Sequence, residues 1–204
     1  MKTLFLNVNA KAPEKDKIKK IVNCLHRGGV VAFPTETVYG LAVDSTNKTA
    51  LNRLYDIKQR DEEKPCAIQI SDISYLNSYI EAIPVKLSEI LNKFWPGPLT
   101  IILNSKEGKV GLRIPDNRVA LAILAEASAP LVVTSANVSG EREAKSAKDV
   151  LDIFDGKIDI VIDDGQLCAG TSSTVLDCTV TPYKIIRAGM ASQEISKMLS
   201  QQSV

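Results

Sequence analysis

Apolar residues recur every three to four positions in several parts of this chain, and this spacing predicts amphipathic helices. Four such stripes cover residues 18–25, 51–58, 87–94 and 147–154, and a shorter one at 195–199 predicts a final helix. Short runs of aliphatic and β-branched residues between the stripes predict strands. They lie at 30–33, 67–70, 99–103, 109–112, 131–133, 160–162, 174–176 and 184–186.

The order of these elements predicts the fold class. Helices that alternate with strands are typical of an α/β fold. The segments at 99–103 and 109–112 are joined by the short polar loop NSKEG, which suits an antiparallel hairpin better than a crossover. We therefore expect a mixed sheet flanked by helices. No linker, repeat or low-complexity segment divides the chain, so residues 1–204 are predicted to form one domain.

The composition is that of a globular protein and argues against several classes. Hydrophobic residues make up 45% of the 204 positions, which is enough for one sizeable core. No apolar run approaches the roughly 18 residues of a membrane span, and the first residues lack a signal-peptide pattern. We therefore expect a cytoplasmic protein with no membrane partner. The net charge of +1 gives no overall attraction for nucleic acid, although it is compatible with a local basic patch.

Cysteine and histidine usage argues against several mechanisms. Cys24, Cys66, Cys168 and Cys178 show no CxxC spacing, so we expect reduced, mostly buried thiols rather than a zinc site or disulfides. The single histidine, His26, lies where a helix should end, a position that the helix dipole favours. Ser-His-Asp and Cys-His mechanisms are therefore poorly supported.

The usual backbone motifs for nucleotides and metals are also absent. The sequence contains neither GxGxxG nor GxxxxGK[ST], and no Asp-x-Asp or histidine cluster indicates a dedicated metal site. A nucleotide would have to be held by side chains, with any Mg²⁺ arriving on its phosphates.

Basic residues after the stripe at 51–58 are candidates for such a role. Lys58 occupies a position that the stripe predicts to be buried, and Arg60 and Lys64 follow in IKQRDEEKP. One interpretation is a cation favoured at a helix C-terminus, whose long stem reaches solvent. The other, with equal weight, is that three cations converge on a phosphate-like anion.

Arginines and hydroxyl groups gather at the predicted strand ends. Arg60, Arg113 and Arg187 are three of only seven arginines among 25 basic residues, and each lies in a loop or at a strand end. Hydroxyl-rich loops occur in PTETV, TSANVSG and AGTSST. Each arginine could form a surface ion pair, and such loops often only cap turns. In an α/β sheet, however, loops at strand ends commonly form the ligand crevice, and this combination suits a polyanion.

Seven motifs in order, across roughly residues 14 to 190, resemble the YrdC-like family of threonylcarbamoyl-adenylate synthases. They are PTETVYGL, KQRDEEKP, FWPGPLT, LRIP, TSANVSG, SSTVLD and IIRAG. The resemblance implies a twisted open mixed sheet with a concave, positively charged face of the kind that binds double-stranded RNA. It also implies that L-threonine, bicarbonate and ATP react to give L-threonylcarbamoyl-AMP and pyrophosphate. The first product would supply the modification of adenosine 37 in tRNA.

The resemblance implies roles for particular residues. ATP contacts are expected from Lys58, Arg60, Thr100, Ser135, Asn137, Ser146 and Arg187. Contacts to threonine or the carbamate are expected from Thr35, Lys64, Arg113 and Ser173. Lys58 and Arg60 would be the catalytic cations, and replacing either by alanine is expected to slow ATP turnover without affecting folding. Asp61 and Cys66 depart from the proline and leucine that the resemblance leads us to expect at these positions.

Two other functions share these features. A non-catalytic module could use the same basic face to bind double-stranded RNA or tRNA, although aromatic residues make up only 5% of the chain. A related hydrolase or YciO-like paralogue could use the cations for another acyl or carbamoyl substrate. The chain resembles the short, single-domain family form, which implies separate proteins that transfer the threonylcarbamoyl group to tRNA.

Overall fold

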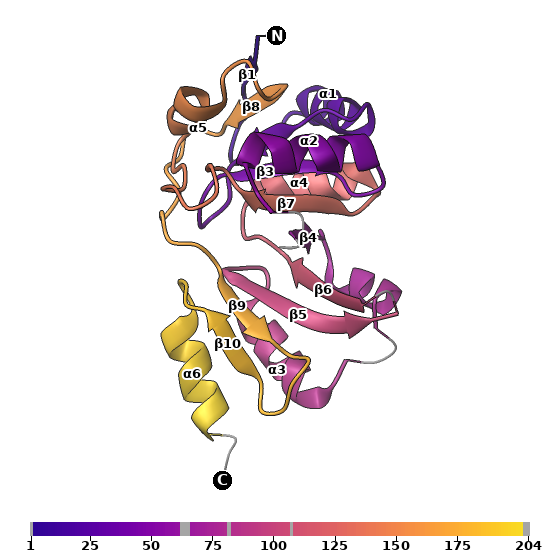
Figure 1. The fold of residues 1–204 in the computed structure, drawn as a ribbon, viewed down its shortest axis with the longest axis vertical. Coiled ribbons are helices and arrows are strands. Elements are labelled where there is room, and N and C mark those ends of the chain that lie inside the picture. The colour runs from indigo at the N-terminus through magenta and orange to yellow at the C-terminus, as the bar shows by residue number, and fades with distance from the viewer. Residues whose placement is uncertain (1, 62–65, 81–82, 107, 202–204) are drawn as a thin grey trace.

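One mixed sheet runs through the computed structural model of this protein (Figure 1). The structure describes residues 2–61, 66–80, 83–106 and 108–201. The described strands are β1 (Leu4–Asn7), β2 (Val31–Phe33), β3 (Gly40–Asp44), β4 (Ala67–Gln69), β5 (Leu99–Ser105), β6 (Gly108–Arg113), β7 (Leu131–Ser135), β8 (Ile160–Asp163), β9 (Thr174–Asp177) and β10 (Lys184–Arg187). They are ordered β1-β8-β2-β3-β7-β4-β6-β5-β9-β10, with parallel and antiparallel pairs, which confirms the predicted mixed α/β sheet.

The helices lie where the apolar stripes predicted them, with two additions, one α-helix and one 3₁₀ helix. They are α1 (Lys15–His26), α2 (Lys48–Lys58), α3 (Val85–Phe94), α4 (Arg118–Ala127), α5 (Ala147–Phe154) and α6 (Ser192–Gln201), and a 3₁₀ helix, η1, covers Ile73–Ser78. Helix α4 escaped prediction because its sequence, RVALAILAEA, is apolar on nearly every side and therefore shows no clear stripe. Strands β1 and β3 were also missed, since each is short and has no polar alternation.

Helices cover both faces of the half-sheet β1-β8-β2-β3-β7. Helices α1 and α4 pack on one face, where Val31 and Phe33 point, and α2 and α5 pack on the other, where Ala32 points. Because side chains alternate along a strand, a strand buried on both faces reads as a continuous apolar run. This explains why the run VVAF, which contains β2 of the β2–β3 hairpin, shows no alternation of polar and apolar residues.

The second half-sheet, β4-β6-β5-β9-β10, is covered differently. Helices α3 and α6 and the 3₁₀ helix η1 all contribute to one core cluster, with Leu99, Ile101 and Leu112 from the strands beneath them. The alternate positions of these strands, including Thr100 and Gly111, face the opposite side of the sheet and line a pocket. The fold therefore leaves one face of this half-sheet available for a ligand.

The predicted hairpin between β5 and β6 is confirmed. Its strands pair antiparallel from Ile101 and Leu112 out to Ser105 and Gly108. The hairpin places Thr100 on β5 beside the β6 residues that lead to Arg113, and so brings two predicted site residues onto one sheet face.

Candidate functional site

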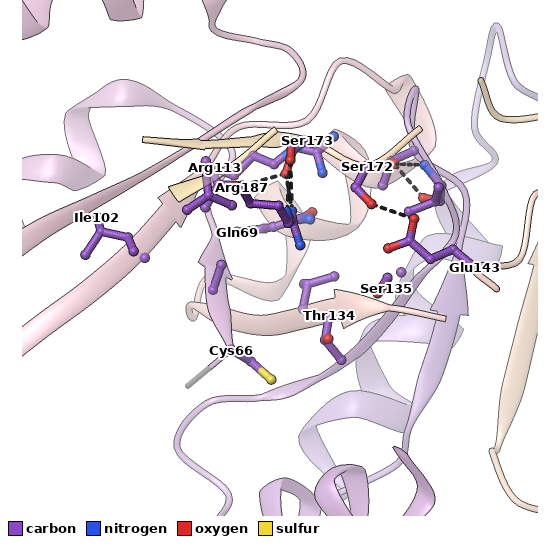
Figure 2. Close-up of a pocket in the computed structure, with 18 of the residues that line it drawn as sticks. Cys66, Gln69, Ile102, Arg113, Thr134, Ser135, Glu143, Ser172, Ser173 and Arg187 are labelled. Carbon is purple, nitrogen blue, oxygen red and sulfur yellow. Dashed lines mark hydrogen bonds between the residues drawn. The ribbon is translucent and has the colours of Figure 1, made fainter. Parts of the chain in front are cut away.

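A pocket of about 510 Å³ lies on the open face of the second half-sheet (Figure 2). Its floor comes from β4, β5, β6 and β9, and its walls come from the loops that follow β2 and β7 and precede β9. Seven predicted site residues line it: Thr35, Arg60, Thr100, Arg113, Ser135, Ser173 and Arg187. The three arginines that the sequence singled out therefore meet in one cavity, together with hydroxyl groups.

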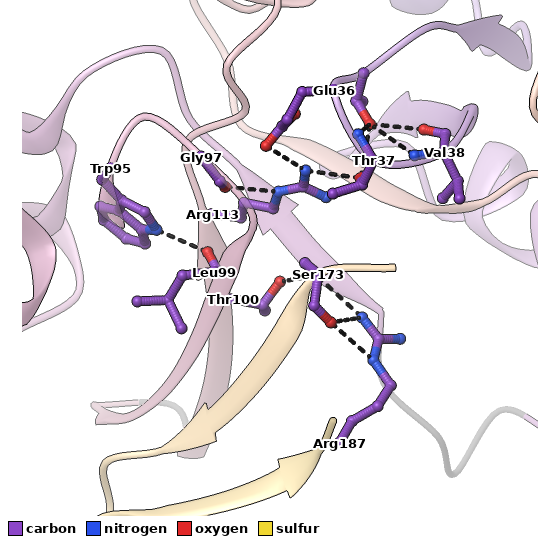
Figure 3. A network of polar contacts seen from close by, with 11 residues as sticks. Glu36, Thr37, Val38, Trp95, Gly97, Leu99, Thr100, Arg113, Ser173 and Arg187 are labelled. Carbon is purple, nitrogen blue, oxygen red and sulfur yellow. Dashed lines mark hydrogen bonds and ion pairs between the residues drawn. The ribbon is translucent and has the colours of Figure 1, made fainter. Parts of the chain in front are cut away.

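Arg113 is held in a fixed orientation at the end of β6 (Figure 3). Its Nη2 donates to Glu36 Oε1 at 2.8 Å and to Thr37 Oγ1 at 2.9 Å, and its Nε donates to the Gly97 carbonyl at 3.3 Å. The ion pair is nearly inaccessible, with 7% of the Arg113 side chain and 17% of the Glu36 side chain exposed. Such a preorganised guanidinium loses little side-chain entropy when it binds a carboxylate.

A second network joins Arg187 to the floor of the pocket (Figure 3). Arg187 Nη2 donates to the Ser173 carbonyl at 2.9 Å and to Ser173 Oγ at 3.0 Å. The Ser173 hydroxyl in turn lies 2.8 Å from Thr100 Oγ1. Arg187 as a residue is exposed, and the partial burial of its guanidinium against Ser173 lowers its pKa from the usual value.

Gly189 explains how Arg187 reaches Ser173. A Cβ atom at position 189 would lie 2.4 Å from the Ser172 carbonyl oxygen and 2.5 Å from the backbone of Ser173. Only a residue without a side chain allows the two segments to approach this closely. The glycine of the IIRAG motif is therefore a packing requirement of the site.

Thr35 lines the pocket, but its hydroxyl also organises the loop between β2 and β3. Thr35 Oγ1 donates to the Val38 carbonyl at 2.6 Å and accepts from the Thr37 N–H at 3.2 Å. The PTETV segment is thus a hydrogen-bonded turn as well as a wall of the pocket. The sequence analysis treated these two interpretations as alternatives, and the structure combines them.

Lys58 is the last residue of α2, as the helix-terminus interpretation expected, but it is not among the residues that line the pocket. Its side chain is buried, with 1% exposed, so it does not reach solvent. Its Nζ donates to the Ser135 carbonyl at 2.5 Å and to the Asn137 carbonyl at 2.8 Å, and lies 3.2 Å from Asn137 Oδ1. Burial lowers the pKa of Lys58 to about 8. The ammonium group therefore ties the end of α2 to the loop after β7.

Asn137 and Ser146 make hydrogen bonds within the segment that joins β7 to α5. Asn137 Nδ2 donates to the carbonyls of Val138 and Glu141, and Asn137 Oδ1 accepts from Ser135 Oγ at 2.7 Å. Unlike Ser135, neither Asn137 nor Ser146 belongs to the lining of the pocket. Lys64 lies outside the described residues.

Ser146 forms a capping box at the start of α5. Its Oγ accepts from the Asp149 N–H at 3.1 Å, and Asp149 Oδ2 accepts from the Ser146 N–H at 3.1 Å. Replacement of Ser146 by alanine is expected to lower the free energy of unfolding by about 1 kcal/mol, because one N–H loses its acceptor. Chemical denaturation measures this loss. A raised KM for ATP at unchanged stability would contradict the capping role and indicate a nucleotide contact.

Several lining residues were not singled out from the sequence. Gln69 and Cys66 come from β4 and its approach, and Glu143 comes from the loop before α5, where its Oε2 accepts from Ser172 Oγ at 2.5 Å (Figure 2). A signal for Gln69 was visible, since it is the polar position of the apolar strand AIQI. Glu143 lies among other charged loop residues, and no sequence signal distinguishes it.

The four cysteines and the single histidine have structural surroundings that match their expected roles. All four cysteines are free and partly buried, which agrees with the expected reduced, mostly buried thiols. His26 is the last residue of α1, as predicted, and its Nε2 lies 3.1 Å from the Ala127 carbonyl of α4.

Among the described residues, no three histidine, cysteine or carboxylate side chains gather as a metal site. No helix in the described ranges has the length and apolar character needed to cross a membrane.

Comparison with known proteins identifies the family of this chain. The family model Sua5_yciO_yrdC, described as "Telomere recombination", matches residues 23–189. The threonylcarbamoyl-AMP synthase of Pyrococcus abyssi is 33% identical over 98% of this chain and 62% of its own length. The chain spans about three fifths of the length of the first curated relatives that it matches.

Solved structures agree with this result. The structure of P. abyssi Sua5 complexed with L-threonine is similar with a TM-score of 0.90 and 34% identity, over 96% of this chain and 61% of that chain. Escherichia coli YciO shares the fold, with a TM-score of 0.84 at 24% identity, over 92% of this chain and 96% of that chain. The matched residues 23–189 include both the sheet and the pocket, and this chain therefore belongs to the Sua5/YciO/YrdC family.

Proposed function

We propose that this chain is an L-threonylcarbamoyladenylate synthase, a nucleotidyltransferase that converts L-threonine, bicarbonate and ATP into L-threonylcarbamoyl-AMP and pyrophosphate. The observation that carries this proposal is the convergence of Arg60, Arg113 and Arg187 in one pocket. A pocket of about 510 Å³ is of ordinary size for small-molecule ligands. The relative in P. abyssi, a threonylcarbamoyl-AMP synthase, and the P. abyssi Sua5 structure with L-threonine support this substrate assignment.

The proposed reaction has two steps. The neutral amine of threonine attacks the carbon of bicarbonate and water leaves, which gives a carbamate. A carbamate oxygen then attacks the α-phosphorus of ATP, and pyrophosphate leaves. Because the carbamate is already an anion, this step requires positioning and cations rather than a strong protein base.

The pocket residues suit these requirements. Arg113, with its fork held by Glu36 and Thr37, would bind the threonine carboxylate. Arg60 and Arg187 would stabilise negative charge on the phosphates, and the hydroxyls of Thr100 and Ser173 lie beside them. Mg²⁺ would enter on the ATP phosphates, and the Glu143 carboxylate is an oxygen donor within reach of the same cavity.

Lys58 would act indirectly in this scheme. Its ammonium group orders the segment from Ser135 to Asn137, and Ser135 lines the pocket. We therefore assign Lys58 as a positioning residue for the ATP side of the site, rather than as a direct phosphate ligand as the family resemblance implied.

The wider role follows from the product. Threonylcarbamoyl-AMP would supply the modification of adenosine 37 in tRNA, in the cytoplasm, through separate transferase proteins. We further propose that the described sheet and helices act as one domain, since both half-sheets belong to the same set of paired strands.

Threonine-dependent release of pyrophosphate tests the proposed function. We expect release from ATP, Mg²⁺ and bicarbonate with L-threonine, and much slower release with L-serine or without an amino acid. Release that is independent of threonine would indicate another acceptor, as in a YciO-like paralogue. Absence of release, together with salt-sensitive binding of double-stranded RNA, would instead favour the non-catalytic function.

A further inference from the structure

Glu143 places a carboxylate in a pocket whose other charged side chains are cations. It is the single acidic side chain among the described residues that line the cavity. The basic ones are Arg60, Lys109, Arg113 and Arg187. Figure 2 shows Glu143 directed from its loop toward Ser172 and the interior of the pocket. A negative charge in this place repels an anionic ligand, so its presence in an anion site needs a physical reason.

One oxygen of the Glu143 carboxylate is already used within the protein. Its Oε2 accepts from Ser172 Oγ at 2.5 Å, and this bond joins the loop before α5 to the loop before β9. Within the described ranges, its Oε1 accepts no hydrogen bond and the carboxylate forms no ion pair. The second oxygen is therefore available to a ligand in the pocket.

A purely structural role would explain this hydrogen bond but not the charge. A neutral amide oxygen would accept equally from Ser172 without repelling an anion. Burial lowers the pKa of Arg187 and that of Lys58, and the negative charge of Glu143 acts in the opposite direction on both. Glu143 is thus close enough to these cations to weaken the attraction of the site for a bare anion.

A divalent cation on the ligand reverses the sign of this effect. Mg²⁺ prefers oxygen ligands, and in nucleotide sites it is bound by substrate phosphates, waters and one or two protein carboxylates. Such a site needs no cluster of three acidic or histidine side chains, and none occurs in the described part of the chain. A hydroxyl beside a carboxylate, as Ser172 provides here, is also the pair that holds Mg²⁺ in P-loop enzymes.

We propose that Glu143 makes the pocket selective for the metal complex of its nucleotide, by binding the divalent cation on the phosphates and by repelling the metal-free triphosphate. This inference rests on the proposed function for the identity of the nucleotide, but it requires neither threonine nor turnover. Arg60 and Arg187 would bind phosphate oxygens that the cation does not contact. The carboxylate thus combines an attraction for one form of the ligand with a repulsion of the other.

Calorimetric titration of ATP, in Mg²⁺ or in EDTA and without threonine, measures this selectivity as the ratio of two dissociation constants. We expect the wild-type protein to bind the Mg²⁺ complex more tightly than metal-free ATP. In Glu143→Gln this preference should fall about tenfold, because the complex loses a charged ligand and metal-free ATP loses a repulsive charge. Glu141→Gln, exposed and two positions earlier in the same loop, should leave the preference unchanged.

A metal titration measures the same coupling from the other side. Coupling between two ligands is reciprocal, so the ATP-bound protein should bind Mn²⁺ about tenfold more weakly in Glu143→Gln than in the wild type. Electron paramagnetic resonance of free Mn²⁺, with protein in excess over ATP, measures this binding without catalysis. Equal Mn²⁺ affinities of the two proteins would contradict the contact between Glu143 and the metal.

A second variant separates this role from a structural one and covers the case in which Glu143→Gln alters the fold. Ser172→Ala breaks the same hydrogen bond but keeps the carboxylate, so the preference for the Mg²⁺ complex should persist. A preference that falls as far in Ser172→Ala as in Glu143→Gln would show that only the hydrogen bond matters, and would overturn the inference.

The outcomes also separate this inference from the proposed function. Equal affinity of the wild-type protein for the two forms of ATP, or an unchanged preference in Glu143→Gln, would overturn the inference. Threonine-dependent pyrophosphate release would then still support the proposed function. A preference that falls in Glu143→Gln, without any such release by the wild type, would support the inference and exclude the proposed reaction.

Discussion

Replacement of Arg113 by methionine is expected to lower kcat/KM for threonine by at least about a hundredfold, since it removes a preorganised cation from the proposed threonine subsite. The same change should destabilise the fold. Glu36 would keep a buried carboxylate without its cation, which costs about 3 to 5 kcal/mol of unfolding free energy when one partner of a buried pair is removed. Pyrophosphate release and chemical denaturation measure the two effects separately.

A double variant distinguishes the two roles of Arg113. Glu36→Gln combined with Arg113→Met removes the uncompensated charge and should recover much of the lost stability. It should not recover turnover, because in the proposed reaction the carboxylate of threonine would still lack its guanidinium partner. Turnover that returns with stability would show that Arg113 acts only through folding. Arg113→Lys should also be impaired, since lysine cannot contact Glu36, Thr37 and Gly97 with one planar group.

Replacement of Lys58 by methionine is expected to reduce both stability and ATP turnover. The sequence alone led us to expect unaffected folding, and we now expect destabilisation because the Lys58 ammonium group is buried and donates to Ser135 and Asn137. Without it, two backbone carbonyls lose a charged donor, and we expect a loss of about 3 kcal/mol. Ser135 would then be less well placed in the pocket. Unchanged stability together with reduced turnover would instead indicate a direct role for Lys58 in catalysis.

The protonation of Lys58 gives this prediction a pH signature. Burial lowers its pKa from 10.5 to about 8, so between these values the unfolded chain binds the proton and the folded protein does not. The free energy of unfolding should therefore rise with pH from about 8 to about 10.5, by up to about 3 kcal/mol from this group. Denaturation curves at several pH values should show this rise in the wild-type protein and a smaller one in Lys58→Met. Parallel pH dependences would contradict the lowered pKa.

Local spacing in the sequence predicted most of the elements. The stripes of α1, α2, α3 and α5 were visible because burial of one helix face imposes a period on the chain, and eight strands were visible as short aliphatic runs. Helices and strands whose sequences lack such a pattern were not predicted. The sequence of α4 is apolar on nearly every side, so residue types do not distinguish its buried face from its exposed face, and the short strand β3 shows no alternation of polar and apolar residues.

The candidate site was predictable in its residue types but not in its contacts. Arginines at strand ends indicated an anion site, and the structure brings Arg60, Arg113 and Arg187 together in one pocket. The partner that orients Arg113, however, is Glu36, 77 positions away in the chain. Such a pair depends on the order of strands in the sheet, which local patterns do not encode.

Lys58 shows most clearly which features the sequence predicted and which it did not. The helical period by itself determined that this position faces inward, and the burial of Lys58 confirms it. Only the tertiary structure decided what its ammonium group meets, namely the carbonyls of Ser135 and Asn137 at the end of β7. The physical reason is that periodicity reports which side of an element is buried, whereas the groups on the other side of that interface are set by long-range strand pairing.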